Sequence, residues 1–412
     1  MINIKPFKAI RPTRDKAYLV ATRSYLSYSD EVLENKLHFN PYTFLHIINP
    51  DKGHGMKPGK RKYRLVKEAF NEFRQEGILT QDPREGYYLY RQVKEGNEYI
   101  GLVAAVSVND YFEGRIKKHE NTLTERERMF TDYLEVTGFN AEPVLLTYQD
   151  DLRLNKLFAH YIEQRSEYEF TSTDKVLHQL WVIDKAEDCQ VITEVMGEQE
   201  ALYIADGHHR CSSSSWLARR IEEKGETRSD HHNFFMAFLI GEEQMKVYDF
   251  NRLIKTTDGL DLPGLISKLR QQFLVERLPG VPYKPEKLHE ISMYAEGSWY
   301  KLMPKTGSYD PQDPIGHLDA EILSKNILKP FLGIKNLKTD KRVGFLPGTE
   351  GMAGLQAAVD SGEYDLAFGL FPVTVEQVKK VADAGKTMPP KSTYIEPKLR
   401  SGLTVYEILQ SS

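Results

Sequence analysis

Hydrophobic and polar residues follow two spacings along this chain, and each spacing predicts one kind of element. Apolar residues in short runs or at every second position indicate strands, and apolar residues three or four positions apart indicate helices. Before residue 200 and just after residue 230, the predicted strands are 18–21, 43–48, 87–92, 98–108, 143–148, 179–184 and 233–240. The predicted helices of the same part are 63–76, 124–136 and 152–164.

The pattern changes after about residue 255. The elements predicted beyond it are helices at 261–272 and 318–332, strands at 290–302, and two strand–helix pairs at 343–359 and 366–384. Mixed strands and helices of this kind predict an α+β protein. We expect a first domain over residues 1–255 and a C-terminal α/β region over residues 256–412 that packs on it.

Composition and charge narrow the class of protein. The 412 residues, with 40% hydrophobic and 28% charged side chains, are ordinary for a folded soluble protein of two or three domains. A formal net charge of -4 offers no basic excess for a nucleic-acid partner. No apolar run approaches the roughly 20 residues of a membrane span, so no membrane association is expected. The two cysteines, Cys189 and Cys211, cannot form a disulfide framework, which favours a reduced, cytoplasmic setting.

One turn carries more chemistry than any other segment. A β-prone run stops at Asp206, and Gly207, His208, His209 and Arg210 follow directly before a predicted helix. A strand that turns into a helix presents backbone N–H groups and the positive end of the helix dipole at one point. Gly207 permits close approach of a ligand, and the planar fork of Arg210 suits phosphate. The turn is therefore predicted to bind phosphate, with a plain helix cap as the alternative.

Three residues of this turn are candidates for catalysis. His208 and His209 are expected to act as general acids or bases near neutral pH. Asp206 is expected to hold a metal ion or to orient a histidine.

Two further segments combine cations with groups that suit phosphate. The predicted phosphate-binding residues of the first are Arg115, Lys117, Lys118 and His119, and its predicted Mg²⁺ ligands are Glu113 and Glu120. In the second, two prolines stiffen the backbone before Lys391 and Ser392. Solvated surface charge and a plain turn are the respective alternatives.

The histidines also suggest a metal centre. The potential ligands are Asp206, His119, His208, His209, His231 and His232. Adjacent histidines on a turn rarely both reach one ion, and the chain holds no pair of histidines four positions apart. A histidine-based metalloenzyme therefore stands behind the phosphate hypothesis.

Four stretches give the chain a likeness to a known family. Residues 111–120, 203–210, 366–371 and 388–403 resemble those of DUF1015, a family of uncharacterised proteins from bacteria and archaea. The strand, turn and helix at 203–210 are also similar to those of the wider ParB/sulfiredoxin-like superfamily, which includes partition-protein nucleotidases, sulfiredoxins and free-serine kinases. The resemblance implies a ParB/sulfiredoxin-like mixed-sheet core.

The resemblance also implies roles for single residues. In that superfamily a glycine-to-arginine motif at the helix start contacts nucleotide phosphates, so Gly207 and Arg210 take these roles. His209 matches the histidine of sulfiredoxins, but His208 stands where sulfiredoxins have cysteine and partition nucleotidases have glutamate. This departure argues against both chemistries. The catalytic glutamate of the serine kinases has three candidates here, Glu31, Glu34 and Glu113.

Three functional hypotheses follow. The first is a nucleotide-dependent phosphotransferase that uses ATP or ADP with Mg²⁺ and acts on a small hydroxylated metabolite, with serine as one candidate. The second is a non-catalytic regulator that binds a nucleotide or another anion, and the third is the metalloenzyme. The expected partners are a nucleotide and a small-molecule substrate, with a homodimer as a candidate assembly.

Overall fold

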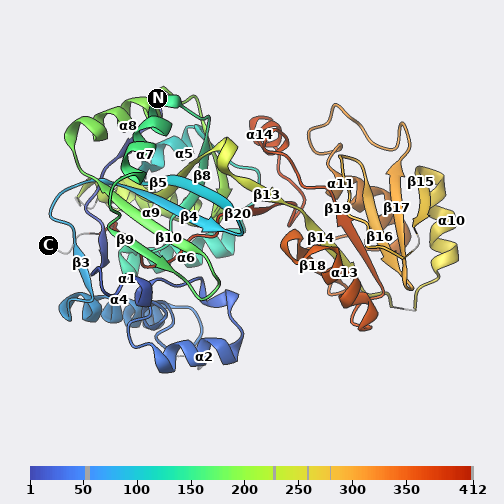
Figure 1. The fold of residues 1–412 in the computed structure, drawn as a ribbon, viewed down its shortest axis with the longest axis horizontal. Coiled ribbons are helices and arrows are strands. Elements are labelled where there is room, and N and C mark those ends of the chain that lie inside the picture. The colour runs from blue at the N-terminus through green and yellow to red at the C-terminus, as the bar shows by residue number, and fades with distance from the viewer. Residues whose placement is uncertain (52–55, 226–228, 258, 279, 410–412) are drawn as a thin grey trace. The chain divides into compact units, whose positions relative to one another are not determined.

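The computed structural model describes residues 1–51, 56–225, 229–257, 259–278 and 280–409, and they form two compact units (Figure 1). Unit 1 contains Met1–Lys117, Asn121–Met245 and Pro397–Ser412, and unit 2 contains Lys118–Glu120 and Lys246–Glu396. The last residues thus group with the first unit, whereas the sequence pattern predicts a single division near residue 255.

A mixed nine-stranded sheet forms the centre of unit 1. Its strands are β1 (Ile4–Lys5), β4 (Tyr87–Lys94), β5 (Asn97–Ser107), β6 (Ile116–Lys117), β8 (Val144–Tyr148), β9 (Tyr168–Thr171), β10 (Leu177–Ile183), β11 (Leu202–Asp206) and β12 (Phe234–Gly241). The order is β6-β11-β8-β12-β5-β4-β10-β9, and β1 pairs with β5. The pairs β6–β11 and β8–β12 are parallel and the others antiparallel. This mixed sheet, with its helices, confirms the predicted α+β class.

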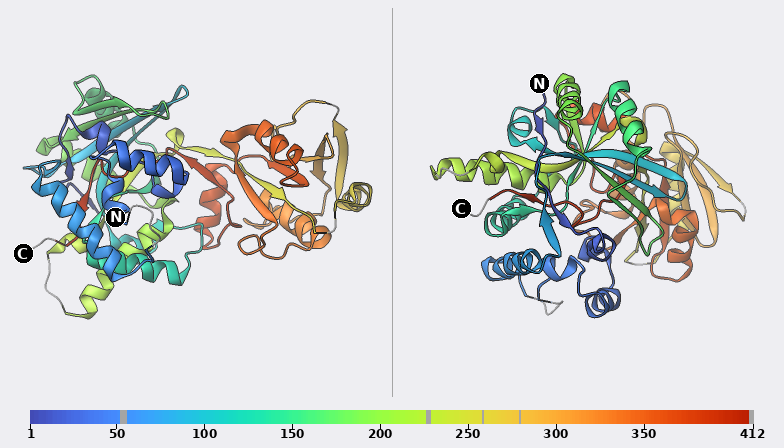
Figure 2. Two further views of the ribbon diagram at one scale, coloured as in Figure 1. Left: turned by 90° about the horizontal axis from the view of Figure 1, so that it is seen from below. Right: turned by 60° about the vertical axis from the view of Figure 1, so that its left-hand side comes forward.

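Helices lie on opposite sides of this sheet (Figures 1 and 2). On one side, α7 (Leu152–Ile162) and α8 (Ala186–Glu198) share a core with the apolar residues of β5. On the other side lie α2 (Asp30–Phe39) and α4 (Lys60–Gln75). The helices α4, α7 and α6 (Thr124–Thr137) and the strands β4, β5, β8, β10 and β12 confirm predicted elements, with small shifts at their ends.

Serines let two helices of unit 1 approach each other closely. The helix α9 (His208–Glu223) packs against α6 through a run of buried serines. The hydroxyl of Thr131 on α6 donates to the backbone oxygen of Ser213 (3.4 Å), and Ser212 donates to the carboxylate of Glu127. Small polar side chains therefore fix the position of the helix that carries the candidate turn.

Two strands predicted near the N-terminus are wrong. Residues 18–21 and 43–48 instead contain the single helical turns α1 (Ala17–Val20) and α3 (Leu45–Ile48). Their apolar side chains join those of α4 in one core, and the backbone of Val20 donates to Lys16 as in a helix. Such short apolar runs contain too few residues to distinguish a helical from an alternating period.

The centre of unit 2 is a six-stranded sheet in which every pair is antiparallel. Its strands are β14 (Phe250–Ile254), β15 (Phe273–Leu278), β16 (Ile291–Ala295), β17 (Ser298–Pro304), β18 (Val343–Pro347) and β19 (Leu366–Leu370). The helix α13 (Gly351–Asp360) connects β18 to β19, and β14 lies between these two strands. Because both pair antiparallel with β14, β18 and β19 run parallel to each other, as in a split β-α-β unit.

The remaining helices of unit 2 follow the sequence pattern. The helix α10 (Leu262–Gln272) matches its prediction, and α14 (Val375–Asp383) begins with a capping box at Thr374. The helix predicted at 318–332 consists of α11 (Asp319–Leu323), a π-helix at Ser324–Leu328 and α12 (Lys329–Leu332). The short strands β13 (Lys246–Tyr248) and β20 (Tyr394–Glu396) pair where the chain enters and leaves the unit. Over the described residues, no helix is both long and apolar enough to cross a bilayer.

Candidate functional site

The predicted strand–turn–helix is present as β11, Gly207 and α9. Leu202 and Ile204 are buried in the sheet core and hold the strand in place. Gly207 has a φ of 95° and a ψ of 29°, in the left-handed region that favours glycine. A Cβ atom at this position would lie 2.8 Å from Nε of Arg210, so the guanidinium folds back over the glycine. Gly207 is therefore required both by its backbone conformation and by the space that Arg210 occupies.

Arg210 lies at the start of α9 between two carboxylates. It forms an ion pair with Glu142, and its Nη2 atom lies 3.9 Å from Oδ2 of Asp206. Burial lowers the pKa of Arg210 to about 10, so the guanidinium stays charged at neutral pH. A positive side chain and the positive end of a helix dipole thus meet at one turn.

Lys398 also reaches this turn, although it lies 192 positions from Asp206 in the sequence. Its Nζ atom donates to Oδ2 of Asp206 (3.4 Å), and the Asp206 side chain remains 47% exposed. His208 is buried, and the backbone oxygen of His209 accepts a hydrogen bond from Ser213 (2.6 Å). The catalytic roles of Asp206, His208 and His209 stay predictions.

Lys398 belongs to a segment, residues 397–402, that we call the C-terminal strap. Gln92 donates to the backbone oxygen of Lys398 (3.3 Å), and Thr22 and Ser401 exchange two backbone hydrogen bonds (3.2 and 2.8 Å). The Ser401 hydroxyl donates to Glu142 (3.5 Å), the partner of Arg210. The strap therefore joins the candidate turn to β4 and to the N-terminal part of unit 1.

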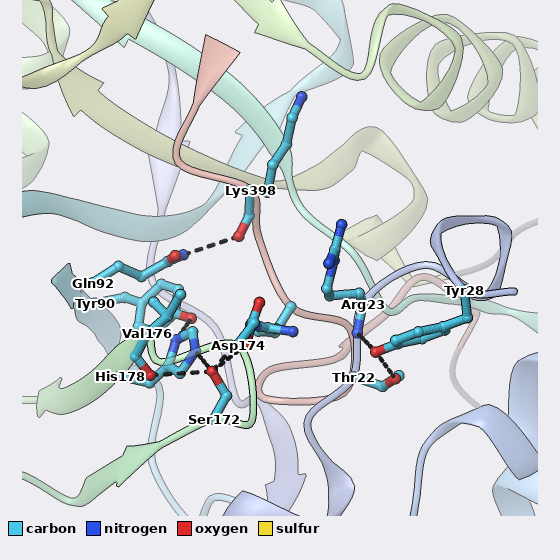
Figure 3. Close-up of polar contacts among 11 residues, drawn as sticks. Thr22, Arg23, Tyr28, Tyr90, Gln92, Ser172, Asp174, Val176, His178 and Lys398 are labelled. Carbon is cyan, nitrogen blue, oxygen red and sulfur yellow. Dashed lines mark hydrogen bonds and ion pairs between the residues drawn. The ribbon is translucent and has the colours of Figure 1, made fainter. Parts of the chain in front are cut away.

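A polar network around buried Arg400 and His178 anchors the strap, and Figure 3 shows its members Ser172, Asp174 and His178. One nitrogen of Arg400 lies 2.6 Å from each carboxylate oxygen of Asp174 and also donates to Ser172 (3.1 Å). His178 lies between Ser172 (3.0 Å, at Nε2) and the hydroxyl of Tyr90 (2.7 Å, at Nδ1). Burial, assisted by the charge of Arg400, lowers the pKa of His178 to about 3, so its ring is neutral. Although burial alone would raise it, the Ser172 hydroxyl and the Arg400 charge lower the pKa of Asp174 to about 2.

The second predicted segment is split between the two units. In unit 1, Arg115 pairs with the buried carboxylate of Asp110 (2.7 Å) and with Glu113. Lys117 lies in β6, in register with Tyr203 of the neighbouring β11. Phosphate binding by Arg115 and Lys117 and metal binding by Glu113 stay predictions, and the structure gives Arg115 and Glu113 an ion pair with each other.

The other predicted residues lie in unit 2, namely Lys118, His119, Glu120, Lys391 and Ser392. The backbone oxygen of buried His119 accepts from Met388 (2.8 Å), which brings the two segments together. The Ser392 hydroxyl donates to Pro389 (2.7 Å), and the Lys391 ammonium lies 5.2 Å from the centre of the Phe250 ring. Ligand binding by these five residues stays a prediction.

An arginine that the sequence patterns did not single out holds the turn before Ser392. Arg252 is 0% exposed and donates to the backbone oxygens of Lys391 (2.9 Å), Pro390 (3.2 Å) and Phe250 (2.5 Å). Burial lowers the pKa of Arg252 to about 9. The turn is thus shaped from inside by a buried cation.

Metal ligands are not grouped in the described part of the chain. Across it, no three His, Cys, Asp or Glu side chains are placed to hold a metal ion together. The hypothesis of a histidine-based metalloenzyme gains no support from these residues.

Comparison with known families gives the chain its classification. The model of the family described as protein of unknown function (DUF1015) matches residues 4–321. The chain belongs to this family. Two of the four stretches that resemble DUF1015, 111–120 and 203–210, lie inside the match, and 366–371 and 388–403 lie beyond it. A comparison with curated proteins finds no match.

Several solved structures resemble this DUF1015 protein distantly. Free serine kinase in complex with AMP shares 15% identity over 73% of this chain and 91% of that chain, with a TM-score of 0.37. SbnI with a C-terminal truncation, from Staphylococcus aureus, shares 13% identity over 75% and 90%, with a TM-score of 0.39. A conserved hypothetical protein from Pyrococcus furiosus shares 15% identity over 73% and 94%, with a TM-score of 0.35. Similarities of this size carry no argument about function.

Proposed function

We propose that this DUF1015 protein is a nucleotide-dependent phosphotransferase that acts on a hydroxyl group of a small metabolite. One observation carries the proposal: Arg210 lies over Gly207 at the start of α9, within a cluster that Lys398 completes. Helix starts with a glycine and an arginine bind phosphate through backbone N–H groups and a bidentate side chain.

The reaction is the transfer of the terminal phosphoryl group of ATP or ADP. The bond between the terminal phosphorus and its bridging oxygen breaks, and a new bond forms between that phosphorus and the substrate oxygen. The substrate hydroxyl loses its proton to a base, and the shortened nucleotide keeps the electrons of the broken bond. Arg210 and Lys398 would neutralise negative charge that develops on the phosphoryl oxygens.

Mg²⁺ is the metal that this chemistry commonly uses, held by one or two carboxylates together with phosphate oxygens. Asp206 fits such a role, because its carboxylate is half exposed and lies beside the two phosphate-binding candidates. When bound, the ion would offset charge on the phosphates. Asp206 itself holds Arg210 and Lys398 in place.

Three glutamates are candidates for the base that takes the proton of the substrate hydroxyl. Glu113 is engaged by Arg115, whereas Glu31 and Glu34 are exposed on α2. The buried face of α2 packs beside Tyr28. The Tyr28 hydroxyl contacts Thr22, the residue whose backbone pairs with Ser401 of the strap. All three glutamates stay candidates for the base, and serine is a first acceptor to test.

A thermal-shift experiment tests the nucleotide part of the proposal. At a concentration about 100-fold above its dissociation constant, a ligand adds about 2.7 kcal/mol to the stability of the protein that binds it. We expect ADP or ATP to raise the melting temperature and Arg210→Ala to remove the rise. Arg220→Ala is the matched control, because Arg220 lies on the same helix but pairs with Asp132 and Glu135 of α6. No rise with either nucleotide in the wild-type protein contradicts the proposal.

The regulator hypothesis predicts the same rise without turnover. Both carboxylates at the turn, Asp206 and Glu142, already pair with cations, which is an arrangement that can serve binding alone. Phosphorus NMR of the protein with nucleotide, Mg²⁺ and a panel of hydroxylated metabolites separates the two. A phosphorylated metabolite supports the transferase, and binding without any product supports the regulator.

A further inference from the structure

A further cation, Arg23, lies next to the strap that carries Lys398. Arg23 follows Thr22, the residue whose backbone pairs with Ser401 of the strap. Figure 3 shows the side chains of Arg23 and Lys398 extending to the same side, away from Asp174 and His178. Two basic side chains from segments far apart in the sequence therefore lie on the same side of the strap in this view, and that of Lys398 contacts Asp206.

Both side chains start from a fixed backbone. The Tyr28 hydroxyl accepts from the backbone N–H of Arg23 (3.1 Å) and bonds to the Thr22 hydroxyl (3.2 Å). Gln92 holds the backbone of Lys398, and Arg400 anchors the strap two residues later. Such preorganisation reduces the entropy lost when flexible cations bind an anion.

Arg23 differs from the other cations in its partners. Arg210 pairs with Glu142 and lies near Asp206, and Lys398 contacts Asp206. In the part of the chain that the structure describes, no carboxylate pairs with Arg23. Arg400 is not part of this set, because it pairs with Asp174.

We propose that Arg23 and Lys398 bind the outer phosphates of the nucleotide, so that the site prefers di- and triphosphates to monophosphates. The inference rests on the proposed function and extends it to the choice of ligand. Arg210 and the start of α9 are enough for one phosphate. A second phosphate adds charge that only further cations can neutralise, and the guanidinium of Arg23 can bind it through two hydrogen bonds.

Calorimetric titration with AMP, ADP, ATP, inorganic phosphate and pyrophosphate tests this preference. We expect the wild-type protein to bind ADP and pyrophosphate at least about tenfold more tightly than AMP and phosphate, which equals about 1.4 kcal/mol. Arg23→Gln and Lys398→Gln should each remove most of that difference and leave AMP binding within about threefold. Lys398→Arg should keep it, because the charge remains.

Lys36→Gln serves as the matched control. Lys36 lies 5.1 Å from the centre of the Tyr28 ring and is thus a nearby cation outside the proposed set. Its loss should change ADP and AMP binding equally. In the wild-type protein, a rising salt concentration should weaken the binding of ADP more than the binding of AMP. This measurement does not depend on the folding of a variant.

The outcomes separate the two proposals. If no phosphate compound binds the wild-type protein, or if Arg210→Ala binds as well as wild type, the proposed function fails. If the wild-type protein binds AMP and ADP equally, or if Arg23→Gln and Lys398→Gln weaken both to the same degree, the preference for outer phosphates is wrong while the proposed function stands.

Discussion

Two arginines of this protein have similarly lowered pKa values but different surroundings. Burial lowers the pKa of Arg210 to about 10 and that of Arg252 to about 9. Arg252 is fully buried and donates to three backbone carbonyls of its own unit. Arg210 is 24% exposed, and its partners are carboxylates.

The difference separates a structural cation, Arg252, from a candidate for ligand binding, Arg210. Backbone carbonyls in a folded turn cannot move away, so the bonds of Arg252 are permanent and shape the Pro389–Ser392 turn. A carboxylate side chain can turn aside and give its place to a phosphate, so the bonds of Arg210 are exchangeable. A lowered pKa alone therefore does not mark a functional residue.

The largest expected effect distinguishes the two arginines by stability. Arg252→Met removes the fully buried donor to the backbone carbonyls of Phe250, Pro390 and Lys391, and we expect the free energy of unfolding to fall by about 3 kcal/mol. Arg210→Met, at a partly exposed position, should cost less than about 1 kcal/mol. Urea denaturation of both variants measures this, and equal losses would contradict the comparison.

The network of Arg400 and His178 gives a second test. It is buried like Arg252, but it holds the strap whose Lys398 contacts the turn of Arg210. The pKa of His178 is about 3 in the folded protein and 6.5 without perturbation. Between pH 3 and pH 6.5 the unfolded chain binds one proton more at His178 than the folded protein does. The stability that comes from keeping His178 neutral is therefore complete above pH 6.5 and is lost as the pH falls toward 3. From pH 6.5 to about pH 5 the wild-type protein should lose about 2 kcal/mol more than His178→Phe does.

Denaturation curves of wild type and His178→Phe at several pH values measure that difference. The groups that face His178 are the hydroxyls of Tyr90 and Ser172 and the Arg400–Asp174 pair, and the substitution leaves all of them in place. Parallel loss of stability in both proteins would show that His178 does not titrate in this way.

The smallest expected effect on stability concerns the turn itself. Gly207→Ala places a Cβ atom in a left-handed conformation and against the Arg210 guanidinium, and we expect a loss of about 1 kcal/mol. Nucleotide affinity should fall at least about tenfold, because the guanidinium must leave its position. Gly225→Ala, with φ of +64° and open space at the other end of α9, should cost a similar stability without weakening nucleotide binding.

Much of the fold could be predicted because its elements are long or strongly patterned. The continuous apolar run of β12 and the helical spacing of α4 leave little choice of structure. At α1 and α3 the sequence pattern predicts strands and the structure has helical turns, because four apolar residues fit either period. The split β-α-β arrangement of unit 2 depends on the insertion of β14 between β18 and β19, which no local pattern reveals.

In the candidate site, too, one part could be predicted from the sequence and another part could not. By itself the sequence determined the membership of the DUF1015 family and a turn in which Gly207 and Arg210 lie close together, because a strand followed by a helix fixes that geometry within a few residues. Only the tertiary structure decided which other charges meet there. Glu142 and Lys398 come from distant segments and reach the turn through their contacts with Arg210 and Asp206. The anchor at Arg400 and the backbone pair of Thr22 and Ser401 hold the strap that carries Lys398. Such contacts depend on how the whole chain packs, so no spacing in the sequence encodes them.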